Sequence, residues 1–425
     1  MTAAIITFIF LLLLGVPIAY VLGIVSVVYM IVSDNALLLM SASQSMFSGT
    51  QNFGLLAIPL FVLVGELMNS GGITTRLIHF ANVLLGHFRG GLAYVNVAAN
   101  MFLAAILGSP TAQTAMMSQV MVPAMEKEGY KKEFSAALTI SSSLLAPMIP
   151  PSLLFIIYGV VAEVSIAQLF LSGILPGIIL ALGMVALIIM ISIKESFPKT
   201  ERASFEQIYK SFFRVFPALL IPIVILVGIL GGIFTVTESS AVAVFVALVV
   251  GGFIYRELDF RKIPKMLKNT AINSSIVTFI IAMAELFGYI LSYERIPQLI
   301  SDFFVSISEN PIVFLLLINV LFLLVGMVME GIAALVILIP ILLPVAVSYG
   351  IDPVHFGVIA CLNLIIGLMT PPVGINLFIA SSIAKIRMED VTRAVVPFIV
   401  MALVVLMLIT FIPSISLWIP ETFSK

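Results

Sequence analysis

Long apolar stretches alternate with short charged clusters through the whole of this 425-residue chain. The charged clusters lie at residues 76–89, 126–133, 194–214, 256–268 and 385–393. A helix needs about 20 consecutive apolar residues to cross the hydrocarbon core of a bilayer, and the stretches between the clusters offer that length. The pattern therefore predicts an all-α integral membrane protein that crosses the membrane many times.

Composition supports this prediction. Hydrophobic residues make up 61% of the chain and charged residues 10%, whereas soluble domains carry about 25% charged residues. The net charge of −1 gives no reason to expect a nucleic-acid partner. Residues 1–33 contain no Lys or Arg, so the basic start of a cleavable signal peptide is missing, and this stretch is predicted to form a first membrane helix.

The distribution of Lys and Arg predicts the topology. Of the 20 Lys and Arg residues, 18 lie in the five clusters. Because Lys and Arg concentrate in cytoplasmic loops, we expect all five clusters to face the cytoplasm. The remaining connections are acidic or neutral, as at Asp34, Glu163 and Asp352, and are expected on the other face. The chain is thus predicted to be a multi-pass membrane protein with these five clusters on the cytoplasmic side.

Two parts of the chain match without gaps when one is shifted by 221 residues. The shift places Pro123, Pro150, Pro151 and Pro176 on Pro344, Pro371, Pro372 and Pro397, and Gly129 on Gly350. The first of the two glycine loops is basic, whereas the second has no Lys or Arg, so they are expected on opposite faces. The sequence therefore predicts inverted repeats, which are typical of secondary transporters; the alternative is two similar bundles without functional symmetry.

Each repeat begins with a charge-free stretch that is interrupted near its middle. The interruptions are residues 108–110 in repeat one and 329–331 in repeat two. Both ends of each stretch are expected on one face of the membrane, so the chain enters and returns. An arm of about 18 residues gives about 27 Å of helix, slightly less than the ~30 Å core. Two short spans and a re-entrant hairpin both fit this length.

Each repeat then has an apolar helix broken by a Pro-Pro pair, at residues 146–152 and 367–374. A proline inside a helix removes the hydrogen bond to the carbonyl four residues earlier. Pro150 and Pro371 are therefore expected to free the carbonyls of Ala146 and Gly367. In a membrane such a carbonyl needs another partner, and a bound Na⁺ is one. The alternative is a structural kink whose carbonyl is satisfied by neighbouring groups.

The hairpin tips and helix breaks together predict a transport site. Neutral oxygens at these places suit Na⁺, and half-helix N-termini attract anions, a layout expected for sodium-coupled uptake of an organic anion. The expected sodium ligands are Gly108, Ser109, Thr111, Ala146, Ile149, Met329, Glu330, Gly367 and Thr370. The residues expected at the substrate are Pro110, Ser152, Gly331, Val373, Gly374 and Asn376.

Other carboxylates in apolar stretches have two interpretations. Glu66 and Glu285 either belong to a transport pathway or make helix–helix hydrogen bonds, and Glu238 is expected to cap a helix. The sequence contains no His-Glu-x-x-His, no Gly-x-Ser-x-Gly and no phosphate-binding loop. We therefore expect neither an enzyme nor a cofactor, with Na⁺ as coupling ion.

Four motifs resemble the large membrane subunit of TRAP (tripartite ATP-independent periplasmic) transporters. They are Leu-Gly-Val-Pro-Ile-Ala at 14–19, Met-Ile-Pro-Pro-Ser at 148–152, Gly-Ile-Phe-Thr-Val-Thr-Glu at 232–238 and Thr-Pro-Pro-Val-Gly-Ile-Asn-Leu-Phe at 370–378. The resemblance covers nearly the whole chain. The family often has aspartate where this chain has Gln113 and Glu330, and a proline where it has Val236.

The resemblance implies an elevator mechanism, in which a mobile domain moves against a static scaffold. It implies scaffold at residues 1–70, 166–292 and 391–425, and the two mobile repeats at 71–165 and 293–390. It also implies a place in the bacterial inner membrane, Na⁺ coupling, a small four-helix membrane partner and a periplasmic binding protein that delivers an organic acid, such as a C4-dicarboxylate or a sialic acid.

Two other functions remain open at this point. A stand-alone sodium–dicarboxylate symporter of related architecture would need no binding protein, but its usual Ser-Asn-Thr tip motif is absent here. A membrane anchor or assembly subunit that does not transport would have no need of paired helix breaks. No Arg lies in the expected site, so a carboxylate clamp is expected on the binding protein.

Overall fold

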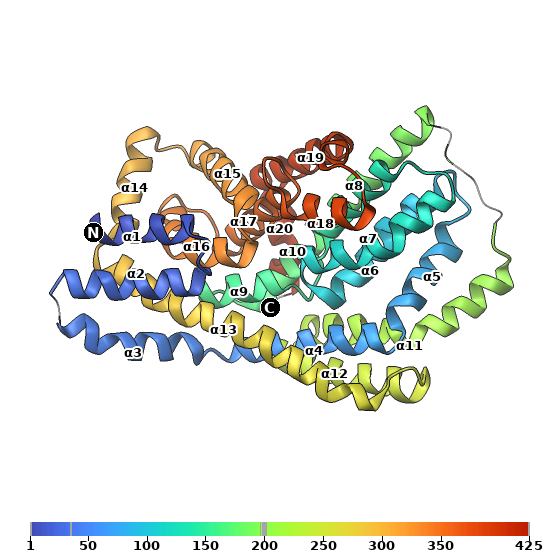
Figure 1. Ribbon diagram of the computed structural model, residues 1–425, viewed down its shortest axis with the longest axis horizontal. Helices are drawn as coiled ribbons and strands as arrows, with labels where there is room; N and C mark the ends of the chain where they lie inside the picture. The colour runs from blue at the N-terminus through green and yellow to red at the C-terminus, as the bar shows by residue number, and fades with distance from the viewer. Residues whose placement is uncertain (1, 35, 196, 198–201, 424–425) are drawn as a thin grey trace.

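The computed structural model describes residues 2–34, 36–195, 197 and 202–423, which form helices and no β-strand (Figure 1). Eight of the described helices are long and apolar enough to cross a membrane. The all-α membrane fold is therefore confirmed. The helices of the first half are α1 (Thr2–Leu13), α2 (Ile18–Val32), α3 (Ala36–Thr50), η1 (Phe53–Leu56), α4 (Ala57–Ser70), α5 (Ile73–Leu85), α6 (Gly91–Leu107), α7 (Pro110–Lys127), α8 (Lys132–Ser142), η2 (Ser143–Leu145), α9 (Leu153–Val161) and α10 (Ile166–Lys194).

The second half repeats the order of the first. Its helices are α11 (Phe205–Leu230), α12 (Val236–Val249), η3 (Val250–Ile254), η4 (Phe260–Lys262), α13 (Ile263–Tyr293), α14 (Ile296–Ile307), α15 (Pro311–Val328), α16 (Gly331–Ser348), α17 (Pro353–Leu368), α18 (Ile375–Ala384), α19 (Met388–Phe411) and α20 (Ser414–Phe423). A shift of 221 residues superimposes the bounds of α7 on those of α16, and it pairs α5, α6, α8, α9 and α10 with α14, α15, α17, α18 and α19. The repeat predicted from the prolines is confirmed.

The two repeats have opposite orientations. Phe134 lies just after the basic loop around Gly129, which joins α7 to α8. The centre of its ring lies 6.3 Å from that of Phe398, in the first half of α19. His355, just after the equivalent loop of repeat two, has its Nδ1 2.6 Å from Ser416 Oγ, beyond the end of α19. The second half of α19 therefore separates two loops that the repeat makes equivalent, so the repeat is inverted as predicted.

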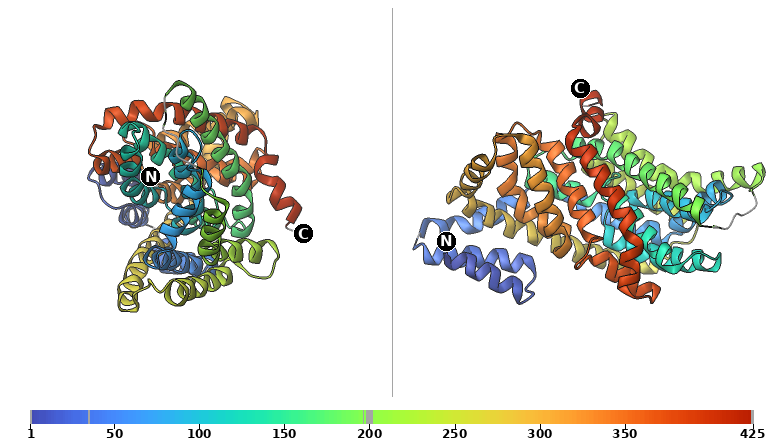
Figure 2. Two further views of the ribbon diagram at one scale, coloured as in Figure 1. Left: turned by 90° about the vertical axis from the view of Figure 1, so that its right-hand side faces the viewer. Right: turned by 90° about the horizontal axis from the view of Figure 1, so that it is seen from above.

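The N-terminus differs from its prediction. Residues 1–33 were expected to form one membrane helix, but α1 and α2 are two short helices that pack side by side. Gly15 has a φ of +71° and Pro17 precedes α2, so the chain turns between them. Helices of 12 and 15 residues reach about 18 and 22 Å, which is less than the ~30 Å core. In Figure 2 these blue helices lie at one end of the molecule.

The first halves of the broken helices form the centre of the core. Every residue of α17 after Pro353 is buried, and so is every residue of α8 from Phe134 onward. In Figure 1, α3, α4, α12 and α13 lie along the lower edge of the molecule, with the hairpins and broken helices above them. Helix α10 packs against α17, α19 and α20. Thus α10, α19 and α20 lie beside the broken helices, although their residues were expected in the scaffold.

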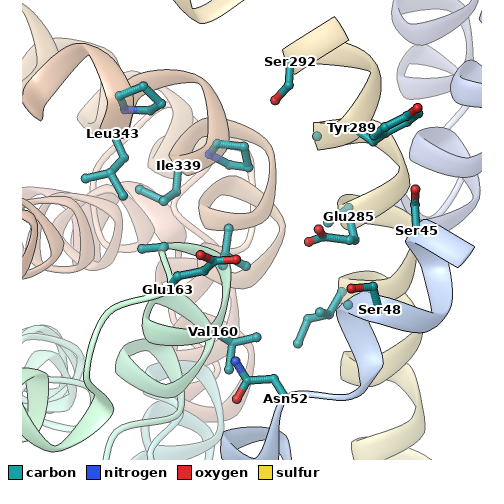
Figure 3. A pocket seen from close by; sticks show the side chains of 18 of the residues that line it. Ser45, Ser48, Asn52, Val160, Glu163, Glu285, Tyr289, Ser292, Ile339 and Leu343 are labelled. Carbon is teal, nitrogen blue, oxygen red and sulfur yellow. The ribbon is translucent and has the colours of Figure 1, made fainter. Parts of the chain in front are cut away.

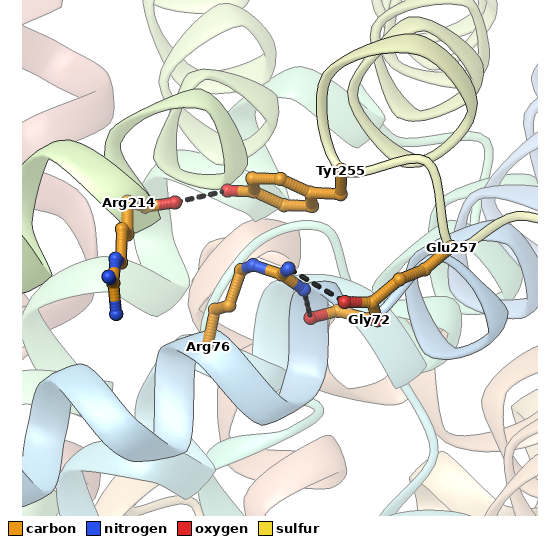
Figure 4. Close-up of polar contacts among 5 residues, drawn as sticks. All are labelled: Gly72, Arg76, Arg214, Tyr255 and Glu257. Atoms are coloured by element: carbon orange, nitrogen blue, oxygen red, sulfur yellow. Dashed lines mark hydrogen bonds and ion pairs between the residues drawn. The ribbon is translucent and has the colours of Figure 1, made fainter.

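Helix α5 is fastened at its start to the connection that follows α12 (Figure 4). Arg76 donates a hydrogen bond to Glu257 at 2.7 Å, and its guanidinium lies 4.0 Å from the centre of the Tyr255 ring. The Tyr255 hydroxyl donates to the carbonyl of Arg214, on α11, at 2.7 Å. One arginine thus connects α5, which leads to the first hairpin, with α11 and α12.

Candidate transport site

Both hairpin tips approach the start of α9. A methyl group on Gly108 would lie 3.2 Å from the Leu153 nitrogen and 3.5 Å from the Pro151 carbonyl oxygen. A methyl group on Gly331 would lie 3.3 Å from Cδ2 of Leu154. The start of α9 is the middle of the first broken helix, and the hairpins come from opposite ends of the bundle. Each hairpin therefore ends inside the bundle, which favours re-entrant hairpins over pairs of full spans.

A small cavity lies where the first tip faces the first break. It holds about 20 Å³, and Gly108, Pro151, Ser152 and Leu153 are among the residues that line it. A volume of roughly 10–15 Å³ on this measure accepts one water molecule. The cavity can therefore hold a water molecule or a small ion, and its lining contains two of the predicted site residues.

The first tip places two hydroxyl groups side by side. Ser109 is the N-cap of α7, and its Oγ accepts a hydrogen bond from the Ala112 N–H at 3.4 Å. The same oxygen lies 3.0 Å from Thr111 Oγ1. Pro110 occupies the first position of the helix, where a missing N–H costs nothing. The tip therefore offers a pair of neutral oxygens at a helix N-terminus.

The first break follows its prediction. The chain leaves α8 through η2, and Ser152 then caps α9 by accepting a hydrogen bond from the Phe155 N–H at 3.2 Å. Among the described residues, no backbone N–H donates to the Ala146 carbonyl, as expected from Pro150. Ile149 turns its side chain toward Gly177 of α10, so its contribution to an ion site would be its backbone carbonyl.

The second break differs from its prediction. The carbonyl of Gly367 accepts a hydrogen bond from the Thr370 N–H at 2.9 Å, so Pro371 does not leave it without a partner. The reason is that the chain closes into a tight turn after α17, in which Thr370 supplies the N–H that Pro371 lacks. Thr370 Oγ1 in turn donates to the Ile366 carbonyl at 2.7 Å. The Gly367 carbonyl and the Thr370 hydroxyl lie in the same turn, but each already takes part in a hydrogen bond.

The second break is joined to the second hairpin. Gly374 has a φ of +57°, and its N–H donates to the Met327 carbonyl at 3.2 Å, shortly before Met329 and the tip. A methyl group on Gly367 would lie 2.6 Å from the Cα of Gly326, so α15 and α17 are in backbone contact. Glu330 is the N-cap residue of α16, and its carbonyl accepts the Ala334 N–H at 3.1 Å.

Asn376 is the predicted site residue with the clearest unmet requirement. It lies in α18 just after Val373 and Gly374, it is fully buried, and neither polar atom of its amide has a partner among the described residues. A buried polar group without a partner costs about 1–3 kcal/mol. The side chain is therefore positioned to receive a water molecule or a ligand.

A polar network within the first repeat was missed from the sequence. Asn96 donates to Thr139 at 2.7 Å, Asn100 donates to the Asn96 side chain at 2.7 Å, and Gln113 donates to the Asn100 side chain at 2.8 Å. These four buried residues join α6, α7 and α8. The network could have been suspected from the sequence, because amide side chains stand in otherwise apolar stretches there.

A large cavity lies between two layers of helices (Figure 3). The lower layer consists of α3, α4, α12 and α13, and the hairpin layer consists of the hairpins and broken helices above them. It has a volume of about 830 Å³ and lies between α3 and α13 on one side and α9 and α16 on the other. Glu285 on α13 and Glu163 after α9 face it from opposite walls. Sequence reasoning had placed Glu163 only in an outer loop. None of the predicted sodium or substrate residues lines this cavity; its polar lining includes Ser45, Ser48, Asn52, Tyr289 and Ser292.

The remaining carboxylates have structural partners. Glu238 accepts from the Thr235 N–H at 2.8 Å, and Thr235 Oγ1 accepts from the Glu238 N–H at 3.2 Å, so the predicted cap is confirmed as a capping box. Val236 takes the first helical position, where proline is favoured. Glu66 accepts a hydrogen bond from Asn269 at 3.5 Å, which joins α4 to α13.

Comparison with known proteins finds relatives that are permease components of one class of transporter. The family described as "Tripartite ATP-independent periplasmic transporter, DctM component" matches residues 5–415. The sialic acid TRAP transporter large permease SiaM of Vibrio cholerae is 39% identical, over 97% of this chain and 96% of that protein. The C4-dicarboxylate large permease DctM of Pseudomonas aeruginosa is 37% identical, over 90% of this chain and 89% of that protein. The isethionate permease DctMQ of Oleidesulfovibrio alaskensis is 39% identical, over 96% of this chain but 64% of its own length.

A solved structure shares the fold. The YdaH transporter of Alcanivorax borkumensis matches with a TM-score of 0.66 over 88% of this chain and 87% of that one, at 12% identity. The curated relatives are transporter permeases and not enzymes, and the eight candidate spans agree with a multi-pass protein of the inner membrane. With a family match over nearly its whole length, the chain belongs to the DctM components of tripartite ATP-independent periplasmic transporters.

Proposed function

We propose that this permease takes up an organic acid, driven by Na⁺, together with a small membrane subunit and a periplasmic binding protein. The relatives that name sialic acid and C4-dicarboxylates as substrates support an organic acid. The observation that carries the proposal is the meeting of both hairpin tips at the start of α9, inside the bundle. Two tips and two broken helices then supply neutral oxygens and helix N-termini in one region, which suits a cation and an anion together.

The sodium ions would be held by the tips and breaks. In repeat one the ligands would be Ser109, Thr111 and the Ala146 carbonyl, which accepts from no backbone N–H of the described residues. In repeat two they would be the Gly367 carbonyl, which keeps a second lone pair beside its hydrogen bond, and the Thr370 hydroxyl, which donates its proton and keeps its lone pairs. Hydroxyl and carbonyl oxygens need no deprotonation, so these ligands fit Na⁺ without pH dependence of their own.

The substrate carboxylate would lie against the half-helix N-termini. Helices α7, α9, α16 and α18 all begin at the tips or breaks, and N-termini carry partial positive charge. The unpartnered amide of Asn376 can donate to a carboxylate oxygen. This assignment explains why a fully buried amide has no partner among the residues that the structure describes.

The elevator movement would take place along the large cavity. The cavity lies where the hairpin layer faces α3 and α13, so relative movement of the two layers would change its shape. We place α10, α19 and α20 in the mobile layer with the hairpins, because α10 packs against α17 and α19 packs against α8. Glu163 and Glu285 would favour cations on this route.

The sodium assignment is tested by uptake into liposomes. The permease, its small membrane subunit and the cognate binding protein should take up substrate under an inward Na⁺ gradient. Ser109→Ala and Thr370→Ala should each raise the Na⁺ concentration for half-maximal uptake, because each removes one neutral oxygen. Thr422→Ala, an exposed hydroxyl on α20, is the matched control. Unchanged Na⁺ dependence in both site variants, with protein levels equal, would refute the assignment.

The same liposomes separate the TRAP mechanism from a stand-alone symporter. Uptake should be nearly absent without the binding protein and should begin when it is added.

Cross-linking tests the elevator movement. Gly54→Cys and Ile166→Cys in a Cys361→Ala background would put two thiols on adjacent residues of the two layers. Cross-linking them with a short reagent should stop uptake, and reduction should restore it. Undiminished uptake by the cross-linked protein would exclude movement of α10 against η1.

A further inference from the structure

A groove lined with basic residues lies at the end of the bundle where the basic loops gather. It has a volume of about 460 Å³ and lies between α5, the start of α11 and the loop after α7. Its charged lining consists of Arg202, Lys210, Arg214 and Glu128, with His79 and His87 beside them. Three permanent cations face one carboxylate, so the groove attracts anions. The transport site described above uses none of these residues.

The cations of the groove are held only weakly by the protein itself. Lys210 forms an ion pair with Glu206 one helical turn earlier, but both side chains are more than half exposed, and such pairs contribute little. Arg214 has no ion pair among the described residues. Figure 4 shows its guanidinium apart from the Arg76–Glu257 pair, although its carbonyl accepts from Tyr255. These groups can therefore turn to a ligand.

An aromatic strip beside the groove places it at the membrane surface. Phe205, Tyr209, Phe212, Phe213 and Phe216 recur along one side of α11 and are between 39% and 82% exposed. Aromatic rings on one face of a helix, with Lys and Arg beside them, are typical of a helix at the membrane surface, and Tyr is enriched at this interface. Lys210 and Arg214 follow Tyr209 and Phe213 directly in sequence, so charge and aromatic surface lie side by side on the same turns.

We propose that the groove binds the headgroup of an anionic phospholipid of the cytoplasmic leaflet, with its acyl chains along the aromatic strip of α11. A basic pocket alone would accept any phosphate, but the adjoining aromatic surface favours a ligand that has both a phosphate and apolar chains. Basic residues mark this end as cytoplasmic, where anionic lipids carry the negative surface potential.

The position of the site gives it a consequence for the fold. One wall is α5 and the loop after α7, which lead into and out of the first hairpin, and the other wall is α11. A bound headgroup would therefore connect the entry of the first hairpin with α11, in parallel with the Arg76–Glu257 contact. The lipid should stabilise the folded permease whether or not the sodium assignment holds.

The proposal is tested on the purified permease in detergent, by native mass spectrometry and thermal unfolding. Phosphatidylglycerol should bind and raise the unfolding temperature, whereas phosphatidylcholine should do neither. The variant with Lys210→Gln and Arg214→Gln should bind phosphatidylglycerol roughly 30-fold more weakly, because each of the two removed cations contributes about equally to the binding free energy. The matched control carries Lys265→Gln and Lys268→Gln at the start of α13, also exposed and basic but outside the groove.

Two further experiments distinguish a lipid from a soluble phosphate ligand. Glycerol 3-phosphate offers the headgroup phosphate without acyl chains and should give no stabilisation at the same concentration. Phe205→Ser with Phe213→Ser should weaken phosphatidylglycerol binding but leave the charges in place. Equal binding of phosphatidylglycerol by the groove variant and the control would overturn the proposal. Equal stabilisation by glycerol 3-phosphate would overturn the lipid in favour of a soluble phosphate ligand.

Discussion

The two hairpins occupy equivalent places in the inverted repeats but are held in different ways. In hairpin one, Asn96, Asn100 and Gln113 form a chain of buried hydrogen bonds that joins both arms to each other and to α8. The residues at the corresponding positions of hairpin two are Leu317, Leu321 and Ala334, which have no polar side-chain atoms. Within the described part of the chain, no side-chain hydrogen bond is found between α15 and α16.

Hairpin two is instead fastened to the second broken helix. Gly326 and Gly367 bring the backbones of α15 and α17 into contact, and Asn363 donates to Asn319 at 2.6 Å across the same helix pair. In hairpin one, side-chain hydrogen bonds thus join α6 to α7. In hairpin two, α15 is bound to α17, and no such bond joins α15 to α16 among the described residues. The comparison indicates that α16 can move relative to α15 more easily than α7 can move relative to α6.

The largest expected effect follows from replacing the glycine of the α15–α17 contact. Gly367→Ala would place a methyl group 2.6 Å from the Gly326 Cα, where only backbone movement can make room. We expect destabilisation of at least about 1–3 kcal/mol and a clear fall in thermal unfolding temperature. Gly288→Ala is the matched control, since its methyl group would meet nothing closer than Pro340 at 3.8 Å. Equal unfolding temperatures would show that this contact does not hold hairpin two.

The hydrogen-bond network of hairpin one should give the next largest effect. Gln113→Leu removes the donor to Asn100 and leaves a buried acceptor unpaired, which costs about 1–3 kcal/mol. Gln298→Leu, exposed on α14, is the control. Converting Asn96, Asn100 and Gln113 together to Leu, Leu and Ala copies hairpin two, and should cost less than Gln113→Leu because few buried polar groups remain unpaired. A triple variant less stable than the single one would contradict this account.

Hydrogen exchange provides a direct comparison without substitution. Amides in the first turns of α16 should exchange faster than those of α7, because α16 lacks the bonds that hold α7 to α6. Mass spectrometry of peptides covering 110–127 and 331–348 measures this difference. Faster exchange in α7 would mean that the buried amides of hairpin one loosen it instead of stabilising it.

The smallest effect concerns the helices that lead into the hairpins. Arg76 holds α5 to Glu257, whereas the equivalent position in α14 is Pro297. Because the pair is partly exposed, Arg76→Gln should cost only about 0–1 kcal/mol. The hydrogen bond from Arg76 lowers the pKa of Glu257 below its usual value.

The pH dependence of that pair has a definite sign. A carboxylate with a lowered pKa stabilises the folded state at pH values above about 4.3, its unfolded pKa. This contribution is lost as the pH falls through the lower folded pKa. The difference in stability between the wild type and Arg76→Gln should therefore disappear in acid. A difference that persists there would assign the role of Arg76 to its contact with the Tyr255 ring.

The sequence by itself determined the architecture. Apolar length and low charge require helices in a bilayer, because a backbone polar group in hydrocarbon must be satisfied within its own segment. The Pro-Pro pairs marked both breaks, since proline cannot continue the hydrogen-bond ladder. The shared spacing of prolines and glycines gave the repeat, and the basic loops gave its inversion. All of these are local properties, so they can be seen without knowing which helices touch.

Only the tertiary structure decided what depends on contacts between distant segments. Residues 1–33 could be one apolar helix by composition, but the turn at Gly15 and Pro17 lets α1 pack on α2. The Gly367 carbonyl looked free beside Pro371 until the fold supplied the Thr370 N–H. Asn376 gave no signal as an unsatisfied amide, because its lack of a partner among the described residues depends on one face of α18 being buried. The cavity between Glu163 and Glu285 likewise exists because two layers meet there, and no single stretch of sequence encodes a meeting of surfaces.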